Sequence, residues 1–163
     1  MPAKINRNAG GYALLEILLA VAVASVIITA MVSLGIAMVR GVTANRSFSE
    51  AGKLSQREAD RLKLLRDIAT DWDDFKSKVS GCSDSAASQT DGCHLEVSGG
   101  SLVKRNGPTT DPSSRISYSF GISPVFPGPT ITRVDYIVRA WWEVAGVQRN
   151  YVIEGAFTSW REE

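Results

Sequence analysis

Few side chains in this sequence belong to the types that carry out catalysis or bind metal ions. The chain of 163 residues contains two cysteines and one histidine, whereas a structural zinc site usually takes about four such ligands. The histidine, His94, directly follows Cys93 and is interpreted as a loop residue and not as a ligand. Neither a Ser-His-Asp arrangement nor a glycine-rich phosphate loop opening a helix is recognisable. The sequence therefore predicts a protein that is not an enzyme and that uses no cofactor and no metal.

Three carboxylates lie close together in the chain, at Asp71, Asp73 and Asp74. On a helix, residues two apart point to different sides. We therefore expect a solvated helix end at these positions and not a metal or catalytic cluster.

Glu16 stands at the start of a long apolar segment. Residues 17–39 include no charge, no proline and no aromatic side chain. A run of about 18 or more apolar residues is typical of a transmembrane helix, which argues against a cytosolic globular enzyme. A carboxylate in such a helix is costly and marks a functional site by default, so we expect a nearby positive group as its partner.

The residues before the apolar segment set its expected orientation. The segment before Glu16 carries Lys4 and Arg7 and no acid, and the positive-inside rule keeps such an end in the cytoplasm. A conventional secretory signal places its small residues after the apolar region, but here Gly10 and Gly11 come before it. Cleavage after Gly11 would leave the whole helix on the chain. The free α-amine of Tyr12, on the same chain or on a neighbour, would then be the natural partner of Glu16.

Residues 11–20, with the sequence GYALLEILLA, resemble the N-terminal motif of type IV pilins and of the pseudopilins of type II secretion. That motif is a short basic leader ending in glycine, an aromatic or apolar first mature residue, a glutamate four residues later and about 20 apolar residues. The resemblance implies that a prepilin peptidase cuts between Gly11 and Tyr12 and that Tyr12 is then N-methylated. It also implies that Glu16 neutralises the amine of an adjacent subunit and so sets the register of a filament.

The resemblance divides the chain into a leader, residues 1–11, a transmembrane and filament-core helix, residues 12–40, and an exported head, residues 41–163. The expected location is the inner membrane with a single span and the head in the periplasm, followed by a pilus or pseudopilus filament. The expected partners are the prepilin peptidase, other minor and major pilin subunits and the inner membrane. Many major pilins carry a proline in mid-helix where this chain has Ser33, so whether the helix melts there stays open.

Within the family, the chain resembles minor pilins of the PilV kind. Residues 14–16, Leu-Leu-Glu, are common in that group, as is a C-terminal strand pair that contains tryptophan. The resemblance implies a role in pilus assembly or priming. The alternative is a minor pseudopilin of type II secretion, of the I-type, which the N-terminal motif does not separate from a pilin; the length of the chain favours a pilin.

The exported part predicts an α+β fold. Apolar positions recur every three or four residues from Phe48 to Val79, which predicts an amphipathic helix that stops near Gly81, with a solvated or subunit-facing turn between Leu54 and Leu62. The remainder predicts antiparallel strands, with the last two as neighbours, at residues 94–97, 101–104, 115–120, 131–144 and 147–158. A sheet with one apolar face needs a cover, which the helix supplies. This arrangement is also the pilin fold.

Two further expectations concern the head. Cys82 and Cys93 flank a stretch rich in serine, aspartate and glycine, and an exported domain permits disulfides, so we expect a bridge; the alternative is two unpaired thiols in a reducing compartment. Trp141 and Trp142 are adjacent and face opposite sides of a strand, so we expect one in the core and the other exposed, at a subunit contact or partly covered by a loop.

The charge balance gives no reason to expect a nucleic acid partner. The formal net charge is +1, and a nucleic-acid-binding domain usually carries a basic stripe. The candidate basic residues in the C-terminal half of the exported part are scattered and not clustered; they include Lys104, Arg105, Arg133, Arg139 and Arg149.

Overall fold

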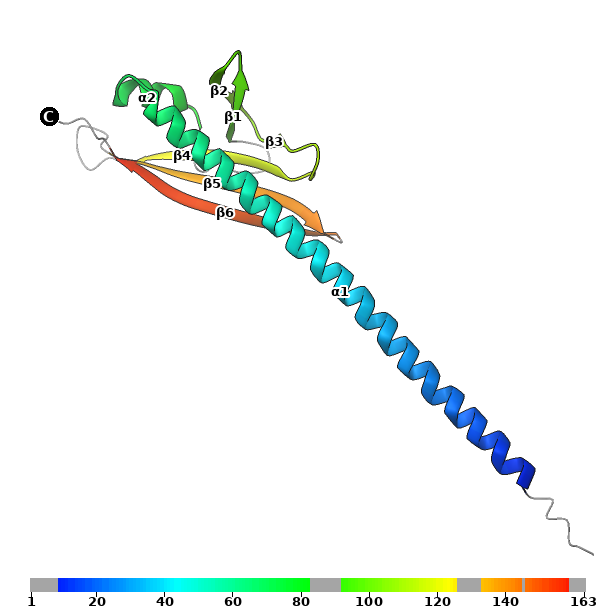
Figure 1. Ribbon diagram of the computed structural model, residues 1–163. Helices are drawn as coiled ribbons and strands as arrows, with labels where there is room; N and C mark the ends of the chain where they lie inside the picture. The colour runs from blue at the N-terminus through cyan, green and yellow to red at the C-terminus, as the bar shows by residue number, and fades with distance from the viewer. Residues whose placement is uncertain (1–8, 83–91, 126–132, 145, 159–163) are drawn as a thin grey trace, which may run out of the picture. The chain divides into compact units, whose positions relative to one another are not determined.

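The computed structural model describes residues 9–82, 92–125, 133–144 and 146–158 (Figure 1). The chain divides into two compact units, Met1–Thr43 and Ala44–Glu163. Helix α1, Ala9–Asp67, contributes to both. The border between the units lies three residues beyond the end of the transmembrane segment expected from the sequence.

The first unit consists of the N-terminal part of α1. Every side chain from Tyr12 to Thr43 is exposed, and the helix is long and apolar enough to cross a membrane. Its hydroxyl groups are satisfied within the helix: Ser25 donates to the Ala22 carbonyl, Thr29 to Ser25 and Ser33 to Thr29, at 2.7–2.8 Å. The helix is unbroken at Ser33. Because these side chains do not need water as a partner, the segment can lie in lipid or against other helices.

In the second unit, α1 lays one face on the sheet. The buried positions recur at helical spacing and are Ala51, Leu54, Ser55, Glu58, Ala59, Leu62 and Leu65. The prediction of a solvated or subunit-facing turn between Leu54 and Leu62 is therefore wrong. The helical period continues through these residues, and the polar side chain of Glu58 finds its partner on the backbone of a strand.

Helix α2, Trp72–Val79, follows after a break in the predicted continuous helix. Asp71 caps it, since the Asp74 backbone N–H donates to Asp71 Oδ1 at 2.7 Å and the Thr70 N–H donates to Asp74 Oδ2 at 3.0 Å. Such reciprocal capping starts a new helix. The break redirects the chain, so that Phe75 and Val79 are buried while Ile68, which the predicted stripe placed in the core, is half exposed.

The sheet contains six antiparallel strands in the order β2-β1-β4-β5-β6, with β3 paired to β4 (Figure 1). Their bounds are β1 Cys93–Ser98, β2 Ser101–Asn106, β3 Thr109–Thr110, β4 Ser117–Val125, β5 Arg133–Val144 and β6 Val147–Thr158. The hairpin around Gly99 and Gly100 and the pairing of the last two strands confirm the predictions. The short β3 was not predicted, and β4 extends beyond the predicted end at Phe120. Residues 131 and 132, the predicted start of β5, lie outside the described residues.

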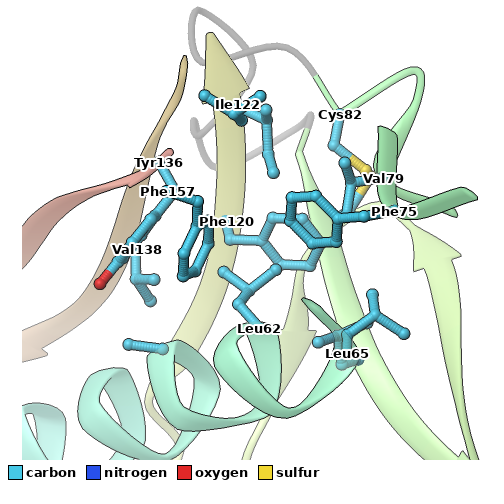
Figure 2. Packing of buried hydrophobic residues seen from close by; sticks show 14 of the residues in the cluster. Leu62, Leu65, Phe75, Val79, Cys82, Phe120, Ile122, Tyr136, Val138 and Phe157 are labelled. Atoms are coloured by element: carbon cyan, nitrogen blue, oxygen red, sulfur yellow. A yellow bond between two sulfur atoms is a disulfide. The ribbon is translucent and has the colours of Figure 1, made fainter. Parts of the chain in front are cut away.

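The larger core cluster lies between the two helices and the sheet. Figure 2 shows Leu62 and Leu65 of α1 and Phe75 of α2 directed toward Phe120 and Phe157 of the sheet. The Phe75 and Phe157 rings meet edge to face with centroids 5.5 Å apart. Burying each such side chain contributes about 1.5–3 kcal/mol. The α+β, pilin-like architecture predicted from the sequence is the one that the structure shows.

The two adjacent tryptophans are both buried. Trp142 lies on the helix side of β5 in a second core cluster with Ala51 and Leu54, and Trp141 lies on the other side. Their exposed fractions are 7% and 8%, so the prediction that one is exposed is wrong. Strand β5 is central, and Trp141 stands between Ser117 of β4 and Asn150 of β6, where neighbours on both sides remove it from water.

Candidate functional site

The N-terminal motif lies on α1, where the helix fixes the spacing of its members. Tyr12 and Glu16 are four positions apart, so they lie about one turn apart on the same side of the helix. Both side chains are exposed, and in the described part of the chain Glu16 makes no ion pair. Gly11 is helical at the backbone and directly precedes Tyr12.

This geometry suits the pairing of a carboxylate with an amine. A chain that began at Tyr12 would carry its positive α-amine at the start of the helix, one turn from the Glu16 carboxylate. A carboxylate in the first turns of a helix is also stabilised by the helix dipole. The carboxylate of Glu16 projects from the outer surface of α1, so an amine on a second helix can reach it as well.

The disulfide expected in the head is present in the structure. Cys82 follows α2, Cys93 begins β1, and their Cα atoms are 5.5 Å apart. Both cysteines are buried in the larger core cluster, and the Ile122 N–H donates to the Cys82 carbonyl at 2.6 Å. Cys93 is also the residue of β1 that pairs with Phe120 of β4. The bridge therefore ties the end of α2 to the point where the β1–β2 hairpin joins the rest of the sheet.

A buried acid that sequence reasoning missed holds the same hairpin. Glu58 of α1 accepts a hydrogen bond from the Leu95 backbone N–H at 2.5 Å. Arg61, one turn further on, donates to the Leu95 carbonyl at 2.8 Å and to Glu58 Oε2 at 3.3 Å. Beyond Cys93, β1 has no paired residue on β4, so these two side chains take the place of a strand partner.

The environment of Glu58 changes its acidity. Burial raises the pKa of the Glu58 carboxyl, and the hydrogen bond from Leu95 and the positive charge of Arg61 offset only part of that effect. The spacing of Leu54, Glu58 and Leu62, four residues apart along the apolar stripe, is the signal that would have identified the buried acid.

The three acids at the start of α2 serve the helix itself. Asp71 is the cap, Asp73 pairs with Lys76 at 2.5 Å, and Asp74 pairs with Lys78 at 2.7 Å. The hydrogen bond from Lys78 lowers the pKa of Asp74. The interpretation of a helix end is confirmed. In the described ranges, no group of three or more histidine, cysteine or acidic side chains is arranged to hold a metal ion.

His94 lies in β1 and not in a loop, so that expectation is wrong. Its Nδ1 is 2.8 Å from the Gly107 carbonyl oxygen, a contact that links β1 to the residues after β2. The histidine thus contributes to the packing of the hairpin.

The comparisons with known proteins add no family assignment. The chain matches no protein-family model, and no curated protein or solved structure is significantly similar to it.

Proposed function

We propose that the chain is a minor type IV pilin, a non-catalytic filament subunit that takes part in the assembly or priming of a pilus after a prepilin peptidase removes residues 1–11. The observation that carries the proposal is the exposed pair Tyr12 and Glu16, one turn apart at the start of an uncharged apolar helix. That helix continues into an α+β head.

Before assembly, α1 would hold the chain in the inner membrane as a single span, with the basic N-terminus in the cytoplasm and the head in the periplasm. The exposed apolar surface from Tyr12 to Thr43 supports this state. In a filament, the same surface would pack against the helices of other subunits. The small and self-satisfied side chains of Ser25, Thr29 and Ser33 allow helices to approach closely.

Glu16 would supply the register of assembly. A lone acidic side chain within an apolar helix costs up to about 2.5–3.5 kcal/mol in a membrane. The methylated amine of Tyr12 on a neighbouring subunit would remove that cost only when the two helices are offset along their axes so that the amine meets Glu16. The head, held rigid by its disulfide and by the Glu58–Leu95 contact, would present the surfaces that choose partners.

The substitution Glu16→Gln tests the proposal in cells that make the prepilin peptidase. We expect the leader to be removed normally, because the cleavage site is unchanged. Breaking one side of a buried ion pair costs about 3–5 kcal/mol, so incorporation into filaments should fall by about a hundredfold or more. The measurement is the amount of the mature chain in filaments sheared from the cell, relative to the amount in the membrane.

Leu19→Gln is the matched control, since it places the same amide one turn away and leaves Glu16 intact. It should be incorporated far better than Glu16→Gln. Equal incorporation of Glu16→Gln and the unchanged protein would contradict the proposed role of the carboxylate. The subunits that copurify with the mature chain would distinguish a pilus from the pseudopilus of a type II secretion system.

A further inference from the structure

The β1–β2 hairpin is anchored to the rest of the head at its base. Within the described ranges, Cys93 is the one residue of β1 that pairs with β4. The same residue carries the disulfide to Cys82. Lys104 of β2 donates a hydrogen bond to the carbonyl of Ser80. Since Ser80 and Cys82 both lie just after α2, these two contacts attach the hairpin to one short segment.

Further along β1, the backbone groups of neighbouring residues point in opposite directions. The Leu95 N–H donates to Glu58 and the Leu95 carbonyl accepts from Arg61, so both groups face α1 and not β2. In an antiparallel pair, residues that bond across the ladder alternate with residues that face outward. The N–H and carbonyl of His94 therefore point toward Arg105, its partner on β2. The backbone of His94 is held within the hairpin, whereas the backbone of Leu95 is held by α1.

The contact with α1 depends on a titratable group. Glu58 is fully buried, and burial raises the pKa of its carboxyl, while the hydrogen bond from Leu95 and the charges of Arg61 and His94 offset part of that effect. If the hairpin moved away from α1, water would reach the carboxyl and its pKa would return toward the ordinary value. Glu58 therefore binds a proton more tightly when the hairpin covers it than when the hairpin is displaced.

The other charged groups on the elements around Glu58 have partners of their own. Arg57 of α1 donates to the hydroxyl of Tyr118 on β4 at 3.2 Å. On the hairpin, Glu96 pairs with Arg105 at 3.1 Å, and Lys104 is bound to the end of α2. Glu58 is thus the group whose protonation changes when the hairpin leaves α1.

We propose that the β1–β2 hairpin is a hinged element of the head, which swings about Cys93, is held to α1 at Leu95, and is released more readily as the pH rises. In acid the closed hairpin covers a neutral carboxyl, whereas at higher pH it must cover a carboxylate, which costs more to bury. The stabilisation of the closed hairpin is fully present below the ordinary value of 4.5 and is lost as the pH rises through the pKa of Glu58 in the closed state.

Release would change the surface of the head. The side chain of Leu95 is 1% exposed when the hairpin is closed, and it would become accessible when the hairpin swings away. The hinge goes beyond the proposed filament role, because it depends only on contacts within the head.

Amide hydrogen exchange of the full chain in detergent, followed by NMR at single residues, tests the hinge without any substitution. The N–H of Leu95 should be several-fold less protected than that of His94, because the open hairpin keeps its own ladder. It should also be less protected than the N–H of Val138 on β5, which lies between β4 and β6. One protection factor shared by all three amides would overturn the proposal, since Leu95 would then be released only with the whole head. Equal exchange at Leu95 and His94 would also overturn it, since the hairpin would then melt and not swing.

Substitutions test the control by pH. The protection factor of Leu95, corrected for the pH dependence of exchange in an open chain, should fall between pH 5 and pH 8 in the unchanged protein and stay constant in Glu58→Gln. Glu96→Gln is the matched control, because it removes an exposed carboxylate from the same strand and leaves Glu58 in place. It should show the same fall as the unchanged protein. A fall that persists in Glu58→Gln would overturn the role of this carboxyl. Neither measurement bears on cleavage after Gly11, so the two proposals fail separately.

Discussion

At the scale of single residues, Glu58 shows what the sequence pattern could and could not reveal. Its position on the apolar stripe of α1 follows from helical periodicity, but charged and polar residues between Leu54 and Leu62 favour a solvated or subunit-facing turn at the level of sequence. Its partner is the backbone of Leu95, 37 residues later, and its burial depends on β1 leaving β4 after Cys93. Local sequence carries no signal for such a distant geometry.

Glu58 should make the stability of the head depend on pH. Because the pKa of Glu58 is raised in the folded chain, the folded state binds more protons than the unfolded state above pH 4.5. Stability from this group is thus fully present below the unfolded value and is lost as pH rises through the folded pKa. We expect Glu58→Gln to flatten the change in unfolding free energy between pH 5 and pH 8.

The measurement is urea unfolding of the full chain in detergent, followed by the fluorescence of the tryptophans, all of which lie after residue 43. Asp74 and Asp111 do not interfere, since their pKa values are lowered, that of Asp111 to about 2 by hydrogen bonds from Ser113 and Ser114. Glu58→Ala, which leaves the Leu95 N–H unpaired, should lose about 1–3 kcal/mol. A Glu58→Gln variant with the pH dependence of the unchanged protein would refute this account.

Two glycines should respond in opposite ways to the same added methyl group. A Cβ at Gly155 of β6 would collide with the ring of Tyr136, whereas a Cβ at Gly52 of α1 would make an ordinary contact at 3.6 Å with Tyr151. Gly155→Ala should therefore lose about 1–3 kcal/mol of unfolding free energy. Gly52→Ala should gain about 0.5–1 kcal/mol because alanine favours the helix. Urea unfolding measures both, and a loss at both positions would show that the packing near Tyr151 is tighter than described.

At the scale of elements, the class and order of the helices and strands could be predicted, but the break before α2 could not. The steps of three and four residues in the apolar pattern continue from Leu62 to Val79, so periodicity alone favours one helix. The capping residues Asp71 and Asp74 are visible in the sequence, but the apolar periodicity that runs through them favours one continuous helix. The two-residue strand β3 leaves too short a pattern to detect.

The cap of α2 should be measurable by a single substitution. Asp71→Ala removes the acceptor of the Asp74 N–H and should lower the unfolding free energy by about 1 kcal/mol. Asp73→Ala is the matched control, because Asp73 lies in the same turn with a side chain that is 87% exposed, and it should change stability by less than about 0.5 kcal/mol. Equal effects of the two substitutions on the urea midpoint would argue against capping.

The disulfide should also contribute to the unfolding free energy of the head, and by more than the cap of α2 does. Cys82 and Cys93 are separated by 11 positions, and closing a loop of that size stabilises the folded state by about 3 kcal/mol in the chain-entropy model. The variant with serine at both positions should lose about that amount, and a reducing agent should then have no further effect on it. If the reductant lowered the stability of both proteins equally, the bridge would not be its target.

At the scale of the whole molecule, the chain combines an apolar helix suited to lipid or to other helices with a head stabilised by its own core. The sequence predicted both parts because hydrophobic runs and periodicity are local features. It also predicted the pair of Tyr12 and Glu16, which the helix places one turn apart. In the proposed function, the partners of this pair lie on other molecules, and neither the sequence nor the fold of a single chain specifies them.

The central claim is that residues 1–11 are a leader, and intact mass with N-terminal sequencing of the membrane-extracted chain tests it most directly. The account predicts a mature chain that begins at N-methylated Tyr12 in cells with the prepilin peptidase and an uncut chain in cells without it. A chain that keeps Met1 or Pro2 in both would contradict the account.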